Sequence, residues 1–114
     1  MEGERDDRVF KALADGSRRM LLDRLFARGG QTLLELTEGL GMSRQAVTKH
    51  LRILEGADLV WWRRSGREKL HFLNPVPIDA IGRRWIEKFE RGRLDGLAEL
   101  KNRLEAEDDN DRAK

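Results

Sequence analysis

The sequence predicts a mainly α-helical fold of about five helices with one small β-hairpin. Two short helices are separated by a glycine-containing turn, and two strand-like runs then flank Ser65-Gly66, a pair suited to a two-residue hairpin turn. A helix-turn-helix followed by such a hairpin, the wing, is the winged helix-turn-helix architecture. We expect helices over residues 8–14, 16–28, 32–40, 43–56 and 78–105.

Polar caps and glycines mark where the helices begin and end. Asp15 and Ser43 are suited to N-cap the second and fourth helices, and Thr32 with Glu35 forms a capping box at the third. Gly29-Gly30 ends the second helix. On that helix the expected inward-facing side chains are Met20, Leu21, Leu25 and Phe26.

The hairpin over residues 59–73 is expected to have one apolar side and one side that is basic near the tip. Ser65-Gly66 occupies the turn in this interpretation. His71 then falls on the outer side of the second strand, where we expect it to be partly exposed. The expected cross-strand pairs are Leu59–Phe72, Trp61–Leu70, Trp62–Lys69 and Arg64–Arg67.

Charge is unevenly distributed along the 114 residues, although the formal net charge is only +2. Residues 43–69 carry seven bases against three acids, whereas residues 1–7 carry four acids against one base. A basic middle between acidic ends indicates a polyanion site, with a solvated charged face as the alternative. We expect one domain over residues 8–105 and disordered acidic termini over residues 1–7 and 106–114.

The sequence also excludes several classes of chemistry. The chain has no cysteine, so disulfides, thiolate metal sites and cysteine catalysis are excluded. No apolar run approaches a membrane span and no secretory signal is visible, so we expect a cytoplasmic protein without a membrane partner. Its two histidines, His50 and His71, have no neighbours arranged as a catalytic set. We therefore expect no enzyme activity, no cofactor and no metal site.

The helix over residues 43–56 divides into a polar arc and an apolar arc when its residues are placed at about 100° intervals. The apolar arc includes His50, which we expect to be packed and hydrogen-bonded. The polar arc carries guanidinium, ammonium and amide groups, which donate to base edges in a DNA major groove. An ordinary amphipathic helix with a wet face is the alternative. The expected DNA-contacting residues are Arg44, Gln45, Thr48, Lys49 and Arg52 on this arc and Arg63, Arg64, Arg67 and Lys69 on the hairpin.

The last helix is longer than a small domain needs to close its own core. Its apolar stripe would leave the stretch from Phe89 to Leu104 exposed in a single subunit. A two-subunit interface explains this stripe better than a cofactor pocket near Trp85, which nothing in the sequence supports. The apolar positions of the helix are Ile78, Ile81, Trp85, Ile86, Phe89, Leu94, Leu97, Leu100 and Leu104.

Several segments, in this order and spacing, resemble the ArsR family of winged-helix regulators over about residues 8–90. LADGSRRMLL (13–22) is similar to the opening of the family's second helix, and MSRQAVTKHLRIL (42–54) to its recognition helix. ADLV (57–60), RRSGR (63–67) and LNP (73–75) are similar to its wing and exit. The resemblance implies a homodimer built on the first and last helices that represses by occupying a palindromic operator. It also implies DNA contacts at Ser43, Arg44, Gln45, Thr48, Lys49 and the wing arginines.

The chain departs from the family pattern at a few places. Gly16 stands where a proline is common, and Asp58 stands where a glycine is common, a position that Asp can occupy in the left-handed conformation at modest cost. Metal sensors of the family carry cysteines on the third helix or Asp/His sets on the last, and this chain has neither. We therefore do not expect this chain to share the metal-sensing function of those family members. The expected dimer-interface residues are Val9, Phe10, Leu13, Trp85, Ile86, Phe89, Leu97, Leu100 and Leu104.

These patterns together favour a sequence-specific transcriptional regulator, a homodimeric repressor that binds duplex DNA and does not sense metal. One alternative is a winged-helix repressor that responds to a small molecule in a dimer-interface pocket. Another is a protein-interaction module that uses the winged fold without DNA. The basic arc and basic wing favour DNA over a protein partner. The sequence indicates no particular inducer.

Overall fold

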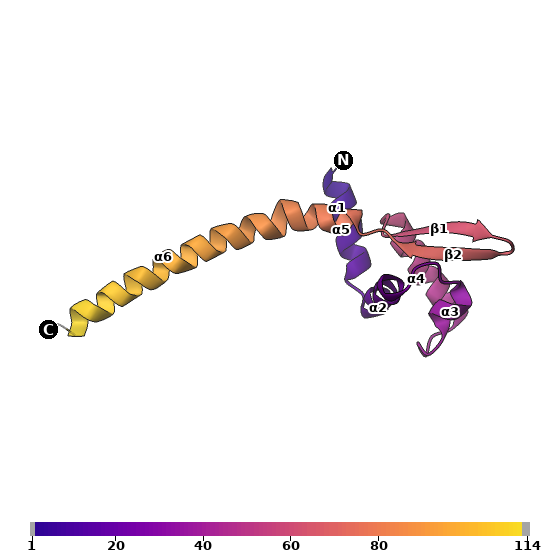
Figure 1. Cartoon of the computed structure of the whole chain (residues 1–114), viewed down its shortest axis with the longest axis horizontal. Coiled ribbons are helices and arrows are strands. Elements are labelled where there is room, and N and C mark those ends of the chain that lie inside the picture. The colour runs from indigo at the N-terminus through magenta and orange to yellow at the C-terminus, as the bar shows by residue number, and fades with distance from the viewer. Residues whose placement is uncertain (1, 113–114) are drawn as a thin grey trace. The chain divides into compact units, whose positions relative to one another are not determined.

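The computed structural model describes the backbone of residues 2–112 and the side chains of residues 3–108. It has the predicted mainly helical fold with one antiparallel hairpin (Figure 1). The chain divides into two compact units, residues 1–79 and 80–114, which are described separately. The elements in chain order are α1 (Glu2–Leu13), α2 (Gly16–Ala27), α3 (Leu33–Thr37), α4 (Arg44–Gly56), β1 (Val60–Ser65), β2 (Glu68–Leu73), α5 (Val76–Ile81), the π-helix η1 (Gly82–Ile86) and α6 (Glu87–Arg112).

The two ends of the chain differ from the sequence-based expectation. The first helix begins at Glu2 and the last one continues to Arg112, although residues 1–7 and 106–114 were expected to be disordered. The parts of that expectation on residues 1, 113 and 114 lie outside the described residues. The single helix expected over residues 78–105 is instead α5, the π turn η1 and α6 in succession.

Side-chain caps start three helices of the first unit as predicted. The Asp15 carboxylate accepts from the backbone N–H groups of Ser17 and Arg18, at 2.8 and 3.2 Å. The bond from Arg18, more than any other influence, holds the pKa of Asp15 below its ordinary value. Thr32 and Glu35 form the capping box at α3, and the Ser43 hydroxyl caps α4. A side-chain hydrogen bond from Arg28 is the main reason that the pKa of Glu35 is also lowered.

The core of the first unit forms around α4, which contacts α1, α2, α3 and β1. On α2 the buried side chains are Leu21, Leu22 and Leu25. The expectation that Met20 and Phe26 also face inward is wrong, because they are 50% and 81% exposed. Met20 lies across the helix from the leucine arc, and Phe26 lies in the last turn, at the edge of that arc. The fully buried large side chains of the core are Val9, Leu21, Leu36, Val47, Leu54 and Leu59.

The hairpin turn lies one residue further along the chain than expected. Ser65 pairs with Glu68, which places Gly66 and Arg67 in the turn, and Trp61 pairs with Phe72 instead of Leu70. Two-residue hairpin turns need a positive φ at their first central position, and Gly66 supplies it at +63°. The expected register placed a serine there. Because each partner moves by two residues, the membership of the two faces is unchanged.

The face of β2 that contains His71 turns toward the domain, so the expectation that His71 is partly exposed is wrong. His71 is only 4% exposed, and its strand pairs on a second edge with the isolated residue Gln31. The His71 N–H donates to the Gln31 carbonyl at 2.8 Å, and the Gly30 N–H donates to the His71 carbonyl at 2.8 Å. The segment after α2 thus acts as a short third strand, which buries this face of the wing at its base.

The second unit consists mainly of the long helix α6 with η1 before it. The rings of Trp85 and Phe89 stack with centroids 5.8 Å apart. Large apolar side chains remain exposed along this unit, at Trp85, Ile86, Phe89, Leu94, Leu97, Leu100 and Leu104. None of the helices in the described part of the chain is both long enough and apolar enough to cross a membrane.

Candidate nucleic-acid interface

The exposed face of α4 is built from its polar arc. Ser43 caps the helix by accepting from the Ala46 N–H at 3.1 Å, which leaves the following side chains free to project from the first turn. Arg44, Gln45, Lys49 and Arg52 are exposed, and Thr48 is half-buried with its hydroxyl donating to the Arg44 carbonyl at 2.8 Å. All five predicted residues of this arc line one shallow groove. The structure therefore brings them together on one face.

The opposite face of α4 is held against the domain by Val47, Leu51 and Leu54, which are buried. Ile53, an apolar residue of the same helix, is 45% exposed. As expected, His50 is partly buried and hydrogen-bonded, with its Nδ1 atom 3.4 Å from the guanidinium of Arg18. Because arginine can only donate, this nitrogen of His50 accepts the bond. These contacts orient the polar arc away from the domain.

The wing divides its cations between its two faces. Arg64 pairs with Lys69 on the face that also carries His71, and the Lys69 ammonium lies 4.1 Å from the centroid of the Trp62 ring. Arg63 lies on the other face, with its guanidinium 5.6 Å from the centroid of the Phe72 ring. All the predicted wing cations are exposed, but Arg63 points away from the side shared by Arg64 and Lys69.

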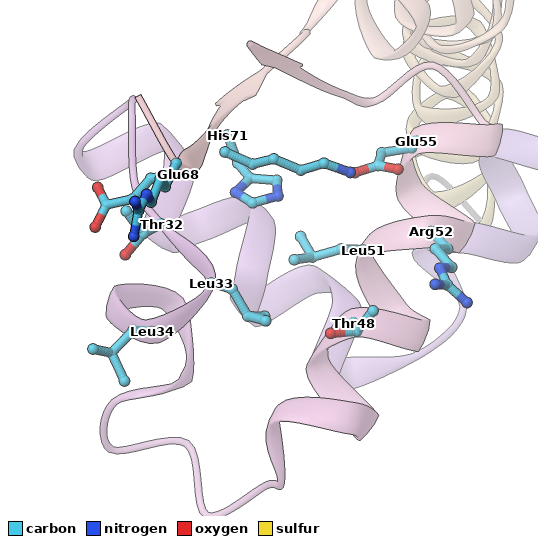
Figure 2. Close-up of a pocket in the computed structure, with 11 residues that line it drawn as sticks. Thr32, Leu33, Leu34, Thr48, Leu51, Arg52, Glu55, Glu68 and His71 are labelled. Atoms are coloured by element: carbon cyan, nitrogen blue, oxygen red, sulfur yellow. The ribbon is translucent and has the colours of Figure 1, made fainter. Parts of the chain in front are cut away.

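A cavity of about 420 Å³ lies between α3, α4 and the wing (Figure 2). Thr48 and Arg52 reach it from α4, and Arg67 and Lys69 reach it from the hairpin, so two predicted DNA-contacting elements share one concave site. The sequence did not indicate this cavity. The cavity depends on the buried position of His71. The one feature of the sequence that could have indicated it is a histidine in a strand that also carries several apolar residues. The remaining lining residues are Thr32, Leu33, Leu34, Leu51, Glu55, Glu68 and His71.

Comparisons with known proteins identify the family to which this chain belongs. A helix-turn-helix domain family matches residues 13–60. The HTH-type transcriptional regulator YuzN of Bacillus subtilis is 41% identical over 93 residues, covering 76% of this chain and 100% of the relative. An ArsR-like transcriptional regulator from Rhodococcus sp. RHA1 superimposes with a TM-score of 0.75 at 30% identity, covering 90% of this chain and 93% of that one. The chain belongs to the ArsR family. It is a DNA-binding transcriptional regulator with a winged helix-turn-helix fold.

Two further matches have names that describe a role or an assembly. The transcriptional repressor SdpR of Bacillus subtilis is 34% identical over 82 residues, covering 71% of this chain and 88% of the relative. The homodimeric winged helix-turn-helix DNA-binding domain Mb0332 of Mycobacterium bovis has a TM-score of 0.57 at 25% identity, with 87% of this chain and 84% of that chain covered. The first name describes SdpR as a repressor, and the second describes the Mb0332 domain as a homodimer.

The predicted dimer residues fall into two groups. On α1 Val9 is buried in the core of its own unit, so the most exposed of the predicted dimer residues on this helix is Phe10, at 53%. Leu13 is half-buried. The six predicted residues on η1 and α6 are all exposed, namely Trp85, Ile86, Phe89, Leu97, Leu100 and Leu104. The structure therefore assigns Val9 a core position in the chain itself.

Proposed function

We propose that this ArsR-family chain is a homodimeric repressor that occupies a two-fold symmetric DNA site and does not respond to metal ions. The exposed polar arc of α4 carries this proposal. Arg44, Gln45 and Lys49 present charged and amide donors on one face, while the opposite face of the helix is buried. Such donors match guanine and adenine edges in the major groove.

The apolar side chains of α6 support the dimer. Phe89, Leu97 and Leu100 are each about half exposed. An apolar strip of this kind is unfavourable in water unless another surface covers it. A second copy of the chain is the occupant we favour, because Mb0332, a fold relative, is homodimeric. A two-fold dimer in turn matches a palindromic site.

The residue content supports a regulator without a metal sensor. The chain has no cysteine. Among the residues that the structure describes, no three His, Asp or Glu side chains come close enough together to hold a metal ion. Tight transition-metal sites need three or four such ligands.

The proposal is tested by selecting bound sites from a random duplex library with the full chain, followed by sedimentation of the complex. We expect inverted repeats with half-site centres about 10–10.5 bp apart or a multiple of this, and two chains per duplex. A promoter that carries the selected site should be transcribed less when the protein is added. Enrichment of single half-sites bound by one chain would overturn the dimeric part, and increased transcription would overturn repression.

The same selection distinguishes a protein-interaction module from a DNA-binding protein. A module that does not use DNA would enrich no sequence, and its weak binding to scrambled duplex would vanish as salt is raised. A regulator should retain a preference for its selected site at physiological salt. The second candidate function, a repressor released by a small molecule, is favoured by one observation, the cavity between α3, α4 and the wing.

A further inference from the structure

We propose that the cavity between α3, α4 and β2 is a binding site for a small hydroxylated aromatic carboxylate, and that a molecule bound there displaces DNA. The cavity lies wholly within residues 32–71, so it belongs to a single subunit. It differs in place from a pocket at the dimer interface. Its volume of about 420 Å³ is within the range of sites for small organic molecules, roughly 300–1,000 Å³.

Leucine side chains give the cavity an apolar wall. Leu33 and Leu34 come from α3, and the buried Leu51 comes from α4. Figure 2 shows Leu33 and Leu51 on either side of the space into which the His71 ring points. An apolar wall with few polar groups is typical of sites that hold the ring system of a ligand.

His71 supplies the inner polar group. Its Nδ1 atom lies 2.9 Å from the Gln31 carbonyl oxygen, and because a carbonyl can only accept, Nδ1 carries the proton of this bond. In the neutral ring Nε2 is then an acceptor. Among the described residues no donor to Nε2 is present, although the residue is 4% exposed. A ligand hydroxyl in the cavity that donates to Nε2 would give this acceptor a partner.

The rim of the cavity favours a single negative charge. Arg52, Arg67 and Lys69 line it together with Glu55 and Glu68, which gives three cations against two acids. A carboxylate pairs with guanidinium or ammonium groups through charge-assisted hydrogen bonds. The two acids disfavour a ligand that carries several negative charges. An aromatic ring with a hydroxyl at the inner end and a carboxylate at the rim meets all three requirements.

Displacement of DNA follows from shared residues, and this part rests on the proposed function. Arg52, Arg67 and Lys69 are also predicted DNA contacts, so a carboxylate at the rim competes with phosphates for the same donors. A bound molecule would also occupy the space between the recognition helix and the wing. Its affinity for the DNA-free protein would then exceed its affinity for the complex.

The site is tested by titrating the full chain, labelled at its leucine methyl groups, with 6-hydroxy-2-naphthoate in the absence of DNA. We expect saturable shifts of the Leu33 and Leu51 methyl signals. 2-Naphthoate lacks the hydroxyl and 6-hydroxy-2-naphthamide lacks the charge, and each should bind about tenfold more weakly. Equal affinity for all three compounds, or shifts confined to the α6 leucines, would overturn the proposal.

Two variants with the same type of substitution localise the site. Leu34→Gln changes an exposed lining residue outside the predicted DNA contacts, and Met20→Gln changes an exposed residue on α2 away from the cavity. We expect Leu34→Gln to weaken binding of 6-hydroxy-2-naphthoate several-fold and Met20→Gln to leave it unchanged. Both should bind the selected DNA site as the parent does. An equal effect of the two substitutions would overturn the assigned location.

Displacement is measured by fluorescence anisotropy of a labelled selected duplex as 6-hydroxy-2-naphthoate is added. The apparent Kd for DNA should rise in proportion to the naphthoate concentration once its own Kd is exceeded. Unchanged DNA affinity at saturating naphthoate would overturn the displacement. Failure of the chain to bind any duplex would instead overturn the proposed function, and the DNA-free titration separates these two results.

Discussion

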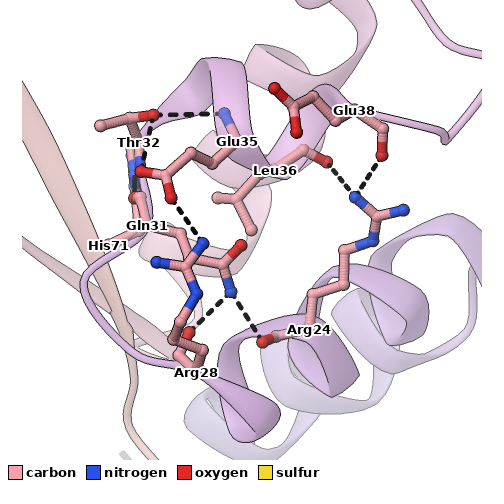
Figure 3. A network of polar contacts seen from close by, with 8 residues as sticks. All are labelled: Arg24, Arg28, Gln31, Thr32, Glu35, Leu36, Glu38 and His71. Atoms are coloured by element: carbon pink, nitrogen blue, oxygen red, sulfur yellow. Dashed lines mark hydrogen bonds and ion pairs between the residues drawn. The ribbon is translucent and has the colours of Figure 1, made fainter.

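The Nδ1 atom of His71 lies 2.9 Å from the main-chain oxygen of Gln31, a residue 40 positions earlier in the chain. Gln31 in turn donates its side-chain amide to the carbonyls of Arg24 and Arg28, at 2.8 and 2.6 Å (Figure 3). Arg24 lies in the last turn of α2, where its carbonyl also accepts from the Arg28 N–H at 3.0 Å, and Arg28 is the C-cap residue of the helix. One glutamine thus caps α2 and anchors the base of the wing, so the position of the wing depends on the end of a helix.

Replacement of Gln31 by Ala should therefore lower the stability of the folded domain. The two carbonyls would lose a donor in a region with little access to water, and we expect a loss of about 1–3 kcal/mol in the free energy of unfolding. Urea unfolding monitored by circular dichroism measures it. Gln45→Ala, the same substitution at an exposed position of α4, should change stability by no more than about 0.5 kcal/mol. Equal losses for both variants would contradict the capping role.

Asp58 should tolerate glycine better than alanine. Its φ is +59°, in the left-handed region, and its carboxylate accepts from the Trp61 indole N–H at 2.7 Å. Asp58→Ala loses this bond and keeps the strain, so we expect a loss of about 1–2 kcal/mol in unfolding free energy. Asp58→Gly loses the bond but removes the strain, and should stay close to the parent. Thermal unfolding of the three proteins gives the order, and a glycine variant as unstable as the alanine variant would refute the strain argument.

Gln45 and Arg67 should differ in their effect on DNA recognition. Gln45 lies on the exposed arc of α4, so Gln45→Ala should cost about 1–3 kcal/mol on the selected site and relax the preference at one base pair. Arg67 lies in the hairpin turn, so Arg67→Ala should weaken selected and scrambled duplexes alike and reduce the salt slope by about one unit. Some sequence dependence at the wing is allowed, because arginine also reads a narrow minor groove.

Binding of both variants to the two duplexes across a salt series measures this difference. A uniform loss for Gln45→Ala together with a loss of specificity for Arg67→Ala would mean that the two roles are reversed. Unchanged binding for both variants would show that neither element contacts DNA in the proposed way.

A charge placed in the α6 stripe should dissociate the dimer. Leu100 is 50% exposed, and Leu100→Asp would place a carboxylate in the covered strip, so we expect monomers at micromolar concentration in sedimentation equilibrium. Ala98→Asp is the matched control, because the exposed Ala98 lies about 160° around the helix from Leu100 and should leave the dimer intact. A parent chain that sediments as a monomer would refute the stripe as an interface.

Zinc, cadmium and arsenite should leave DNA affinity unchanged. The chain has no cysteine, and no cluster of three His, Asp or Glu side chains is found in the part of the chain that the structure describes. Titration calorimetry with zinc and DNA binding in its presence provide the measurement. One tightly bound zinc ion per subunit, or a shift in the DNA Kd upon its addition, would contradict this prediction.

Local chemistry allowed the sequence alone to predict the fold class, the caps and the exposed arc of the recognition helix. An Asp or Ser before a helix, or a Thr three residues before a Glu, satisfies nearby N–H groups wherever the helix lies. A 13-residue helix such as α4 also separates polar from apolar residues by its own period. The left-handed conformation of Asp58 was anticipated from the family resemblance, since a glycine is common at that position.

Tertiary structure alone decided the environment of His71 and the cavity, whereas the turn register had a local cause in the positive φ of Gly66. Alternation along a strand shows which side chains share a face, but which face is buried depends on what packs against it, and that partner is Gln31, from a distant segment. The π turn at Gly82–Ile86 and the exposure of Phe26 had no local signal either. Contacts between residues far apart in sequence set the environment of His71 and the cavity, and no short window of sequence contains both partners.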